Sequence, residues 1–271
     1  MKFSKYHGTG NDFILIDHEP KDPSLLAIKM CDRHQGIGAD GLIYPSASKL
    51  YDIRFNYYNS DGSIAPMCGN GMRTFVKYLF DEGILVKTSF VAETLAGPIS
   101  VSYDRDLEWI RVDLGTPIVH LSNPDLIEVQ QQLKEHEVVI DQTRVKFYTI
   151  MLGTLHTMID DDASFNSEII GPKLAYHPFF PKATNVNFVK VVDRKHIQVK
   201  TYERGAGWTL SCGTGSAASA WLSHQLGKTE NHIHVTVPGG ELKVHIDQTV
   251  QLIGPAQKIA KGVFEIHEKG L

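Results

Sequence analysis

Short runs of β-branched, aromatic and other apolar residues, often alternating with polar ones, recur along the whole chain and predict β-strands. The clearest runs cover residues 13–17, 52–58, 99–103, 185–192, 196–202 and 232–237. Helical patterns are fewer. One helix is expected to start at Asp22, an N-cap residue followed by Pro23, and two more follow Cys68 and Cys212. The pattern predicts a strand-rich α+β protein.

The two helices that follow cysteines start at similar glycine-rich turns. After Cys68, apolar residues recur at helical spacing from Met72 to Phe80, and Gly83 ends the helix. After Cys212, a helix built of small and apolar residues runs on to Gly227. A helix that is small or apolar on nearly every side is expected to be buried, so its N-terminus should point into an interior cleft.

The segment around Cys68 returns at a shift of 144 residues. The shift aligns Ile53 with Ile197, Tyr58 with Tyr202, Asn59 with Glu203, Cys68 with Cys212, Gly69 with Gly213 and Gly71 with Gly215. Two copies of one unit predict two similar domains facing each other across a pseudo-twofold axis, with a linker near residues 115–124. The alternative is a duplicated scaffold whose matching glycines only shape turns, although a turn needs no cysteine at its corner.

Composition and charge narrow the class of partner. The chain has 271 residues, of which 42% are hydrophobic and 21% charged, and it is long enough for two domains. A net charge of −4 creates no strong attraction to nucleic acid or to an acidic membrane surface. Neither a membrane span nor a signal peptide is visible. We therefore expect a cytoplasmic protein with a small-molecule ligand and no nucleic-acid or membrane partner.

The setting of Cys68 and Cys212 suits proton transfer. Three cysteines cannot form a disulfide framework, so in a reducing compartment each is a packing residue or a chemical group. Unpaired amides at a helix N-terminus stabilise a thiolate or hold a carboxylate, and glycine lets a substrate approach closely. Inverting a carbon centre requires a base on one face and an acid on the other. Two cysteines on facing domains would supply both, with no metal or organic electron sink required.

Short motifs spread over almost the entire chain extend this picture. They are Lys5–Phe13, Arg33–Gly41, Tyr58–Gly62 leading to Cys68–Gly71, Thr94–Gly97, Thr184–Phe188, Tyr202–Gly205 before Cys212–Gly215, and Gly254–Ala256. Each piece is short, but in this combination and order they closely resemble the diaminopimelate epimerase family.

The resemblance implies the interconversion of LL- and meso-diaminopimelate in lysine and cell-wall precursor synthesis, without pyridoxal phosphate, by a pair matching Cys68 and Cys212. It implies two similar domains, each a mixed sheet or barrel around a central helix, with the last strand returning to the first domain. The expected bounds are 1–116 with 262–271, carrying Cys68, and 117–261, carrying Cys212. Homodimers are common in the family, and no cofactor or metal site is implied.

The resemblance also implies roles for individual residues. Glu203 matches the family's acidic group beside the substrate amino group, and His156 matches the histidine that supports it. The residues matching those that bind the distal end of the substrate are Asn11, Asn59, Asn185 and Arg204. The residues matching the carboxylate-binding turns are Gly69, Asn70, Gly213 and Thr214.

Two departures from the family pattern bear on substrate preference. Many members have an Asn-Pro pair where this chain has Thr154 and Leu155, and they often have a second Glu where it has Trp208. A racemase or epimerase of the same fold acting on another amino acid is therefore the nearest rival. A thiol redox protein is a rival of another class, but neither Cys68 nor Cys212 has a Cys-x-x-Cys partner. A non-catalytic ligand-binding protein would not need the two thiols.

The remaining candidate motifs favour structural roles. Cys31 has no glycine turn beside it and is expected to pack in a helix. Residues 36–41 match a dinucleotide-binding fingerprint, but a helix precedes and a strand follows them, the reverse of what that motif needs. His232 and His234 alternate along an expected strand without a partner at metal spacing, which is typical of surface strand histidines.

Overall fold

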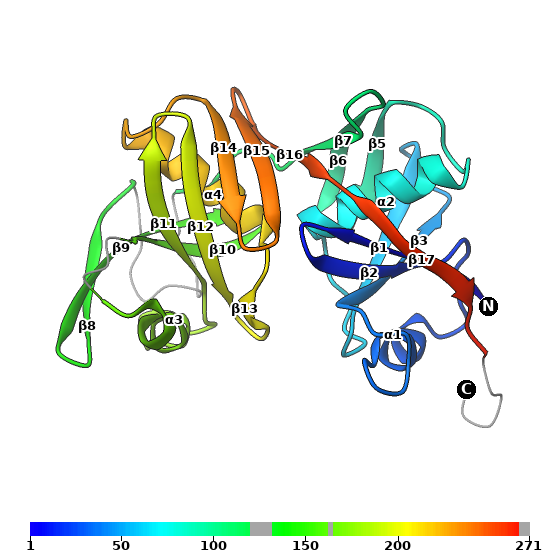
Figure 1. The fold of residues 1–271 in the computed structure, drawn as a ribbon, viewed down its shortest axis with the longest axis horizontal. Helices are drawn as coiled ribbons and strands as arrows, with labels where there is room; N and C mark the ends of the chain where they lie inside the picture. The colour runs from blue at the N-terminus through cyan, green and yellow to red at the C-terminus, as the bar shows by residue number, and fades with distance from the viewer. Residues whose placement is uncertain (120–131, 162–164, 266–271) are drawn as a thin grey trace. The chain divides into compact units, whose positions relative to one another are not determined.

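The computed structural model describes residues 1–119, 132–161 and 165–265, and it is a strand-rich α+β protein (Figure 1). The helices are α1 (Pro23–Cys31), α2 (Gly69–Asp81), α3 (Ser167–Ala175) and α4 (Gly213–Gln225). The strands are β1 (Lys2–Gly8), β2 (Asn11–Leu15), β3 (Gly41–Ser46), β4 (Ile53–Asn59), β5 (Ser89–Thr94), β6 (Gly97–Asp104), β7 (Trp109–Asp113), β8 (His136–Ile140), β9 (Thr143–Leu152), β10 (Thr154–Asp160), β11 (Asn185–Asp193), β12 (His196–Glu203), β13 (Gly207–Thr209), β14 (His232–Val237), β15 (Gly240–Ile246), β16 (Val250–Pro255) and β17 (Gln257–Val263). The predicted fold class is confirmed.

The chain divides into two compact units, and each is described by itself. The first unit consists of Met1–Asp113 and Ile253–Leu271, and the second consists of Leu114–Leu252. The expected domain bounds, 1–116 with 262–271 and 117–261, stay a prediction. Part of the expected linker near residues 115–124, from residue 120 onward, lies outside the described residues.

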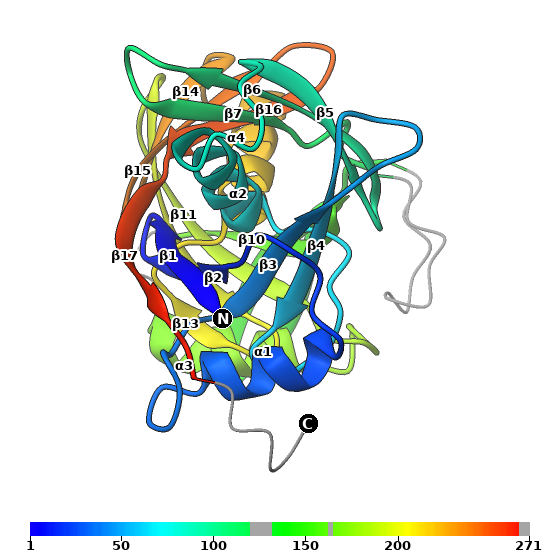
Figure 2. The same cartoon turned by 90° about the vertical axis from the view of Figure 1, so that its right-hand side faces the viewer.

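In the first unit, helix α2 packs against β1, β2, β3, β4, β6, β7 and β17. Strand β1 pairs antiparallel with both β2 and β17, as Figure 2 shows. Strands β2 and β3 are parallel, as are β4 and β5. The apolar face predicted for α2 lies in the core, because Met72, Phe75, Val76 and Leu79 are fully buried. Burial of this face against the surrounding strands holds the helix N-terminus in place.

The second unit repeats this plan around helix α4, which packs against β9, β10, β11, β12, β14 and β15. Strands β10 and β11 are parallel, as are β12 and β14. The small residues predicted to make α4 a buried helix do so, because Ala217, Ala218 and Ala220 are fully inaccessible to solvent. Small side chains allow strands to approach this helix on most of its sides.

The 144-residue repeat extends through the secondary structure of both units. A shift of 144 residues carries the first and last residues of α1 onto those of α3, and those of α2 onto those of α4. It also carries the pairing of Leu42 with Tyr58 onto that of Val186 with Tyr202. Helix α3, which contains Pro172, is not predicted by the sequence patterns above. The two halves of the chain are therefore copies of one fold.

Several local predictions are confirmed. Asp22 caps α1 by accepting a hydrogen bond from the Leu25 amide at 2.9 Å. Cys31 is buried in the cluster that contains Leu26 and Met30. Residues 36–41 follow α1 and lead into β3, so the segment has the reversed order that argues against a dinucleotide site. None of the helices in the described ranges has the length and hydropathy needed to cross a membrane.

Candidate active site

Cys68 is the N-cap of helix α2, with extended backbone angles (φ −144°, ψ 123°). Its sulfur accepts a hydrogen bond from the Gly71 amide at 3.3 Å, and the residue is partly exposed to solvent. The predicted position just ahead of a helix is therefore confirmed. A sulfur that accepts from the first turn of a helix is stabilised as a thiolate by the amide and by the helix dipole.

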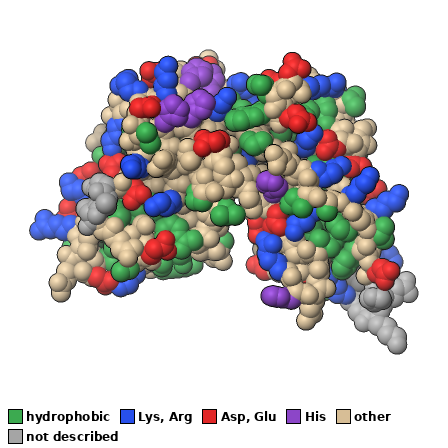
Figure 3. Space-filling model, in the orientation of Figure 1, with side chains coloured by type: hydrophobic (Ala, Val, Ile, Leu, Met, Phe, Trp, Pro, Cys, Tyr) green, Lys and Arg blue, Asp and Glu red, His purple; other side chains and the backbone are tan. Residues whose placement is uncertain are grey.

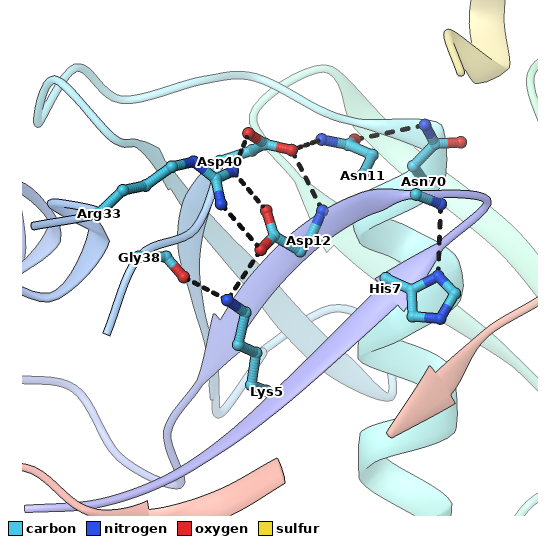
Figure 4. Close-up of polar contacts among 9 residues, drawn as sticks. Lys5, His7, Asn11, Asp12, Arg33, Gly38, Asp40 and Asn70 are labelled. Carbon is cyan, nitrogen blue, oxygen red and sulfur yellow. Dashed lines mark hydrogen bonds and ion pairs between the residues drawn. The ribbon is translucent and has the colours of Figure 1, made fainter. Parts of the chain in front are cut away.

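The structure brings Asn11 and Asn70 to the same turn. The Asn11 side-chain oxygen accepts hydrogen bonds from the Asn70 side-chain nitrogen at 3.3 Å and from the Cys68 thiol at 3.9 Å. The Asn11 amide nitrogen donates to Asp40 (Figure 4). Gly69 is buried at the start of the same helix. We call Asn11, Cys68, Gly69 and Asn70 the Cys68 cluster.

Ionic groups behind Asn11 hold it in place, as Figure 4 shows. Arg33 bridges the carboxylates of Asp12 and Asp40, each at 2.8 Å, and Lys5 pairs with Asp12 at 2.9 Å. Burial would raise the pKa of Asp12, but hydrogen bonds from Arg33 and Lys5 outweigh it and lower that pKa. The sequence motifs include these residues but give no sign that Asp40 binds Asn11, because 29 residues separate them.

Asn59, also predicted to bind the distal end of the substrate, ends strand β4. Its carbonyl oxygen accepts from the Tyr57 hydroxyl at 2.7 Å, and its nitrogen donates to Ser63 at 2.9 Å. These contacts with near neighbours in the chain orient the Asn59 amide.

In the second unit, Cys212 is the N-cap of α4 and only 6% of its surface is exposed. Its sulfur lies 3.7 Å from the Thr214 hydroxyl. Burial, together with the nearby Glu203, raises the pKa of Cys212 well above its usual value. The turn requires glycine at residue 215, because a Cβ there would lie 2.3 Å from the Asn187 side-chain oxygen. The predicted turn residues Gly213 and Thr214 begin this helix.

His156 lies on β10 and is fully buried. Its Nδ1 is 3.3 Å from the Asn187 side-chain nitrogen. The oxygen of the same Asn187 amide accepts a hydrogen bond from the Thr201 hydroxyl at 3.0 Å. With the amide oriented in this way, Nδ1 is the acceptor and the proton resides on Nε2. Among the described residues, Nε2 has no hydrogen-bond partner. Burial lowers the pKa of His156 to about 3, with a smaller contribution from Arg204, so the ring is neutral.

Asn185 and Arg204 meet at the end of the same sheet. Asn185 pairs with His156 in the parallel β10–β11 register and donates to the Thr154 hydroxyl at 2.8 Å. Its oxygen accepts from the Arg204 backbone amide at 3.0 Å. The Arg204 guanidinium donates to the Lys182 carbonyl at 3.1 Å and is exposed. Thr154 therefore fixes the Asn185 side chain.

Glu203 ends β12, and its carboxylate accepts from the Thr209 hydroxyl at 2.7 Å. Trp208 packs with Phe188 and Tyr202, with ring centroids 5.7 and 5.6 Å away. We call the seven predicted residues of this unit the Cys212 cluster: His156, Asn185, Glu203, Arg204, Cys212, Gly213 and Thr214. Sequence reasoning missed Asn187, although it stands two residues after Asn185 on one strand and so on the same face.

Histidines gather on one face over strands of the second unit, as Figure 3 shows. The rings of His196 and His234 lie 5.0 Å apart, and those of His232 and His245 lie 4.0 Å apart. His232 and His234 are exposed residues of β14, as expected of surface strand histidines. Within the described ranges, no group of three or more metal-binding side chains could hold a metal ion.

Comparison with known proteins identifies the family. The family model described as diaminopimelate epimerase matches residues 3–120 and 148–259. The diaminopimelate epimerase of Caldanaerobacter subterraneus is 40% identical, with 98% of this chain and 100% of that protein covered. That of Alkaliphilus metalliredigens is 37% identical, with 97% of each covered. The structure of a probable proline racemase from Agrobacterium radiobacter matches with a TM-score of 0.75 at 16% identity, covering 99% of this chain and 94% of that one, and so shares the fold. The chain belongs to the diaminopimelate epimerase family.

Proposed function

We propose that this protein interconverts LL- and meso-diaminopimelate by moving a proton between Cys68 and Cys212. The observation that carries the proposal is that each cysteine is the N-cap of the central helix of its unit. Family membership supports the substrate, since relatives at about 40% identity bear the name of this activity. The mechanism requires both clusters to close on the same α-carbon.

The proposed proton transfer uses only groups of this chain. The thiolate of one cysteine removes the α-proton, and the thiol of the other donates its proton to the opposite face of the carbon. The carbon inverts, and the two sulfurs exchange their protonation states. Amides of the first turns of α2 and α4 would hold the substrate carboxylate, which gains negative charge as the α-proton leaves.

Asn59 and other members of the two clusters would hold the rest of the substrate. Glu203 would bind the amino group at the reacting centre, with neutral His156 behind it. Asn11, Asn59, Asn185 and Arg204 would hold the distal amino-acid group. A second carboxylate and a second amine need both donors and acceptors, and these side chains provide both.

The test is incubation with LL-diaminopimelate in heavy water, following stereochemistry and deuterium at the α-carbon. We expect meso product that carries deuterium at the inverted centre. Cys68→Ser and Cys212→Ser should each reduce turnover by about 100-fold or more, because a serine hydroxyl is a far weaker acid than a thiol. Cys31→Ala is the matched control and should retain activity. Unchanged epimerisation in both serine variants would rule out the cysteine pair.

A racemase acting on a different amino acid is the second candidate, and Thr154 favours it. By the family resemblance, Thr154 stands where many members have asparagine, and its hydroxyl accepts a hydrogen bond from the Asn185 side chain at 2.8 Å. Exchange of the α-hydrogen should be compared between diaminopimelate and α-amino acids that lack the second amino-acid group. Faster exchange with the latter would favour this candidate over the first.

Two broader expectations belong to the same proposal. We propose a cytoplasmic location, because Cys31, Cys68 and Cys212 are all free thiols and a reducing compartment keeps them so. We also propose a homodimer, as the family resemblance implies. Cell fractionation and sedimentation equilibrium would test these two points separately.

A further inference from the structure

Asn187 occupies a position that is polar in one copy of the repeat and apolar in the other. The 144-residue shift aligns Asn187 of β11 with Ile43 of β3, and both side chains are fully buried. Each packs against a matching glycine in the first turn of a central helix. A Cβ on Gly71 would lie 3.2 Å from the Ile43 side chain, and one on Gly215 would lie 2.3 Å from the Asn187 oxygen. The fold therefore accepts an aliphatic side chain at this position, and the amide of Asn187 serves another purpose.

Two backbone carbonyls fix the orientation of the Asn187 amide. Its nitrogen donates to the Thr157 carbonyl at 3.2 Å and to the Asn185 carbonyl at 3.4 Å. Its oxygen accepts a hydrogen bond from the Thr201 hydroxyl at 3.0 Å. Exchanging nitrogen and oxygen would set the amide oxygen against two carbonyl oxygens, so only one orientation satisfies the group. The nitrogen therefore points toward β10, the strand of Thr157.

This orientation decides which ring nitrogen of His156 carries the proton. The Asn187 nitrogen lies 3.3 Å from His156 Nδ1, so a donor faces Nδ1 and the proton of the neutral ring resides on Nε2. Three neighbouring strands thus contribute a row of hydrogen bonds that runs from Thr201 on β12 through Asn187 on β11 to His156 on β10. All donors point the same way along this row, so the bonds polarise one another.

The row ends on a buried donor. Within the part of the chain that the structure describes, His156 Nε2 has no hydrogen-bond partner, although the residue is fully inaccessible to solvent. A buried N–H without an acceptor is unfavourable, so this group points to an acceptor that a ligand brings. The row lies beside the start of α4, because Asn187 packs against Gly215. A carboxylate oxygen is the strongest acceptor that an amino acid offers.

We propose that Asn187 is a positioning residue that locks His156 in the tautomer with the proton on Nε2, so that His156 donates a hydrogen bond to a carboxylate oxygen of the substrate. His156 then acts as a fixed donor and not as a base, since a base would need an unprotonated nitrogen at that place. The inference rests on the proposed function, in which the Cys212 cluster binds an amino-acid substrate.

Nitrogen NMR of the substrate-free enzyme reads the tautomer directly. With isotope-labelled histidine, long-range proton–nitrogen correlations at neutral pH distinguish a protonated ring nitrogen from an unprotonated one. The His156→Gln variant identifies the signals of His156 by their loss. We expect the proton on Nε2 and none on Nδ1. A proton on Nδ1 in the wild type would overturn the proposal.

Variants test the part played by Asn187. Asn187→Leu removes the donor to Nδ1 but keeps an aliphatic side chain, which the fold already holds as Ile43 in the other copy. We expect both tautomers of His156 to be populated in this variant, and kcat with diaminopimelate to fall by about 10-fold or more. Thr201→Val is the matched control. It removes a buried hydroxyl from the same row, but the two carbonyls still orient the amide, so the tautomer should not change.

A folded Asn187→Leu protein that keeps the wild-type tautomer would refute the role of Asn187. Should this variant not fold, the wild type with substrate decides. Saturating diaminopimelate should move the resonance of the Nε2 proton, because a carboxylate acceptor draws that proton toward it. An unmoved resonance in an enzyme that turns over diaminopimelate would count against the donor.

Failure of the two proposals can be told apart. The tautomer in the substrate-free protein does not depend on turnover. A protein with the expected tautomer that leaves diaminopimelate unchanged would refute the proposed function and keep the effect of Asn187 on His156. An active epimerase with the proton on Nδ1 would refute this inference alone.

Discussion

At the scale of single residues, buried polar side chains define the chemistry of both clusters. Arg73 donates to the Asn70 side chain at 3.0 Å. Arg73 and His156 are both fully buried, yet the first stays charged and the second stays neutral. The difference follows from their ordinary pKa values, since burial disfavours the charged form of each but guanidinium starts far above neutral pH. A buried neutral histidine has a measurable effect on stability.

His156 should make the folded protein less stable as the pH falls. Its pKa is about 3 in the folded protein and 6.5 in the unfolded chain, so the unfolded state binds the extra proton between these values. Stability is therefore fully present above about pH 6.5 and is lost progressively toward pH 3. The free energy of unfolding, measured with urea across this pH range, should depend less steeply on pH in His156→Gln than in wild type. The exposed control His232→Gln should keep the pH dependence of the wild type. An unchanged pH dependence in His156→Gln would contradict the description of His156 as a buried neutral histidine.

At the scale of elements, the repeat includes the residues that start the helices. Asp22 caps α1, and Asn166, its match at the 144-residue shift, caps α3 by accepting from the Glu168 amide at 3.0 Å. The sequence pattern revealed the first cap but not the second helix. Asn166 is a good N-cap, but Pro172 lies inside α3, and proline usually breaks a helix when it lies in the interior.

Removing either cap should cost similar stability. Asp22→Ala and Asn166→Ala are each expected to lower the free energy of unfolding by about 1 kcal/mol, because a helix amide loses its acceptor. Lys21→Ala, an exposed neighbour, serves as control and should change stability little. Equilibrium denaturation would measure all three. A neutral effect of Asn166→Ala would show that packing alone sets the start of α3.

At the scale of the whole molecule, the proposed function makes the enzyme sensitive to oxidation. If Cys68 and Cys212 bracket one carbon atom, they can join as a disulfide when substrate is absent. We expect oxidant to abolish turnover and a thiol reductant to restore it. Peptide mapping without reduction should recover the Cys68–Cys212 linkage. The Cys31→Ala variant should behave like wild type, whereas oxidation that leaves turnover intact would argue against adjacent sulfurs.

The sequence by itself determined the repeat, the fold class and the two cysteine turns, because these depend on local spacing. N-caps, glycine turns and helical periodicity act within a few residues of each other, so Cys68 and Cys212 could be placed at helix starts. The family motifs likewise consist of short continuous segments. Asn11, Asn70 and Cys68 were predicted as site residues on that basis.

Only the tertiary structure decided which side chains support the clusters. Arg73 meets the Pro255 carbonyl across 182 residues and the Thr9 hydroxyl across 64, and Asn11 meets Asp40 across 29. No local pattern distinguishes a buried arginine from the solvated one that a helix usually carries. Burial and charge balance arise from packing between distant segments, so the difference between the two cysteines became visible only in the folded chain.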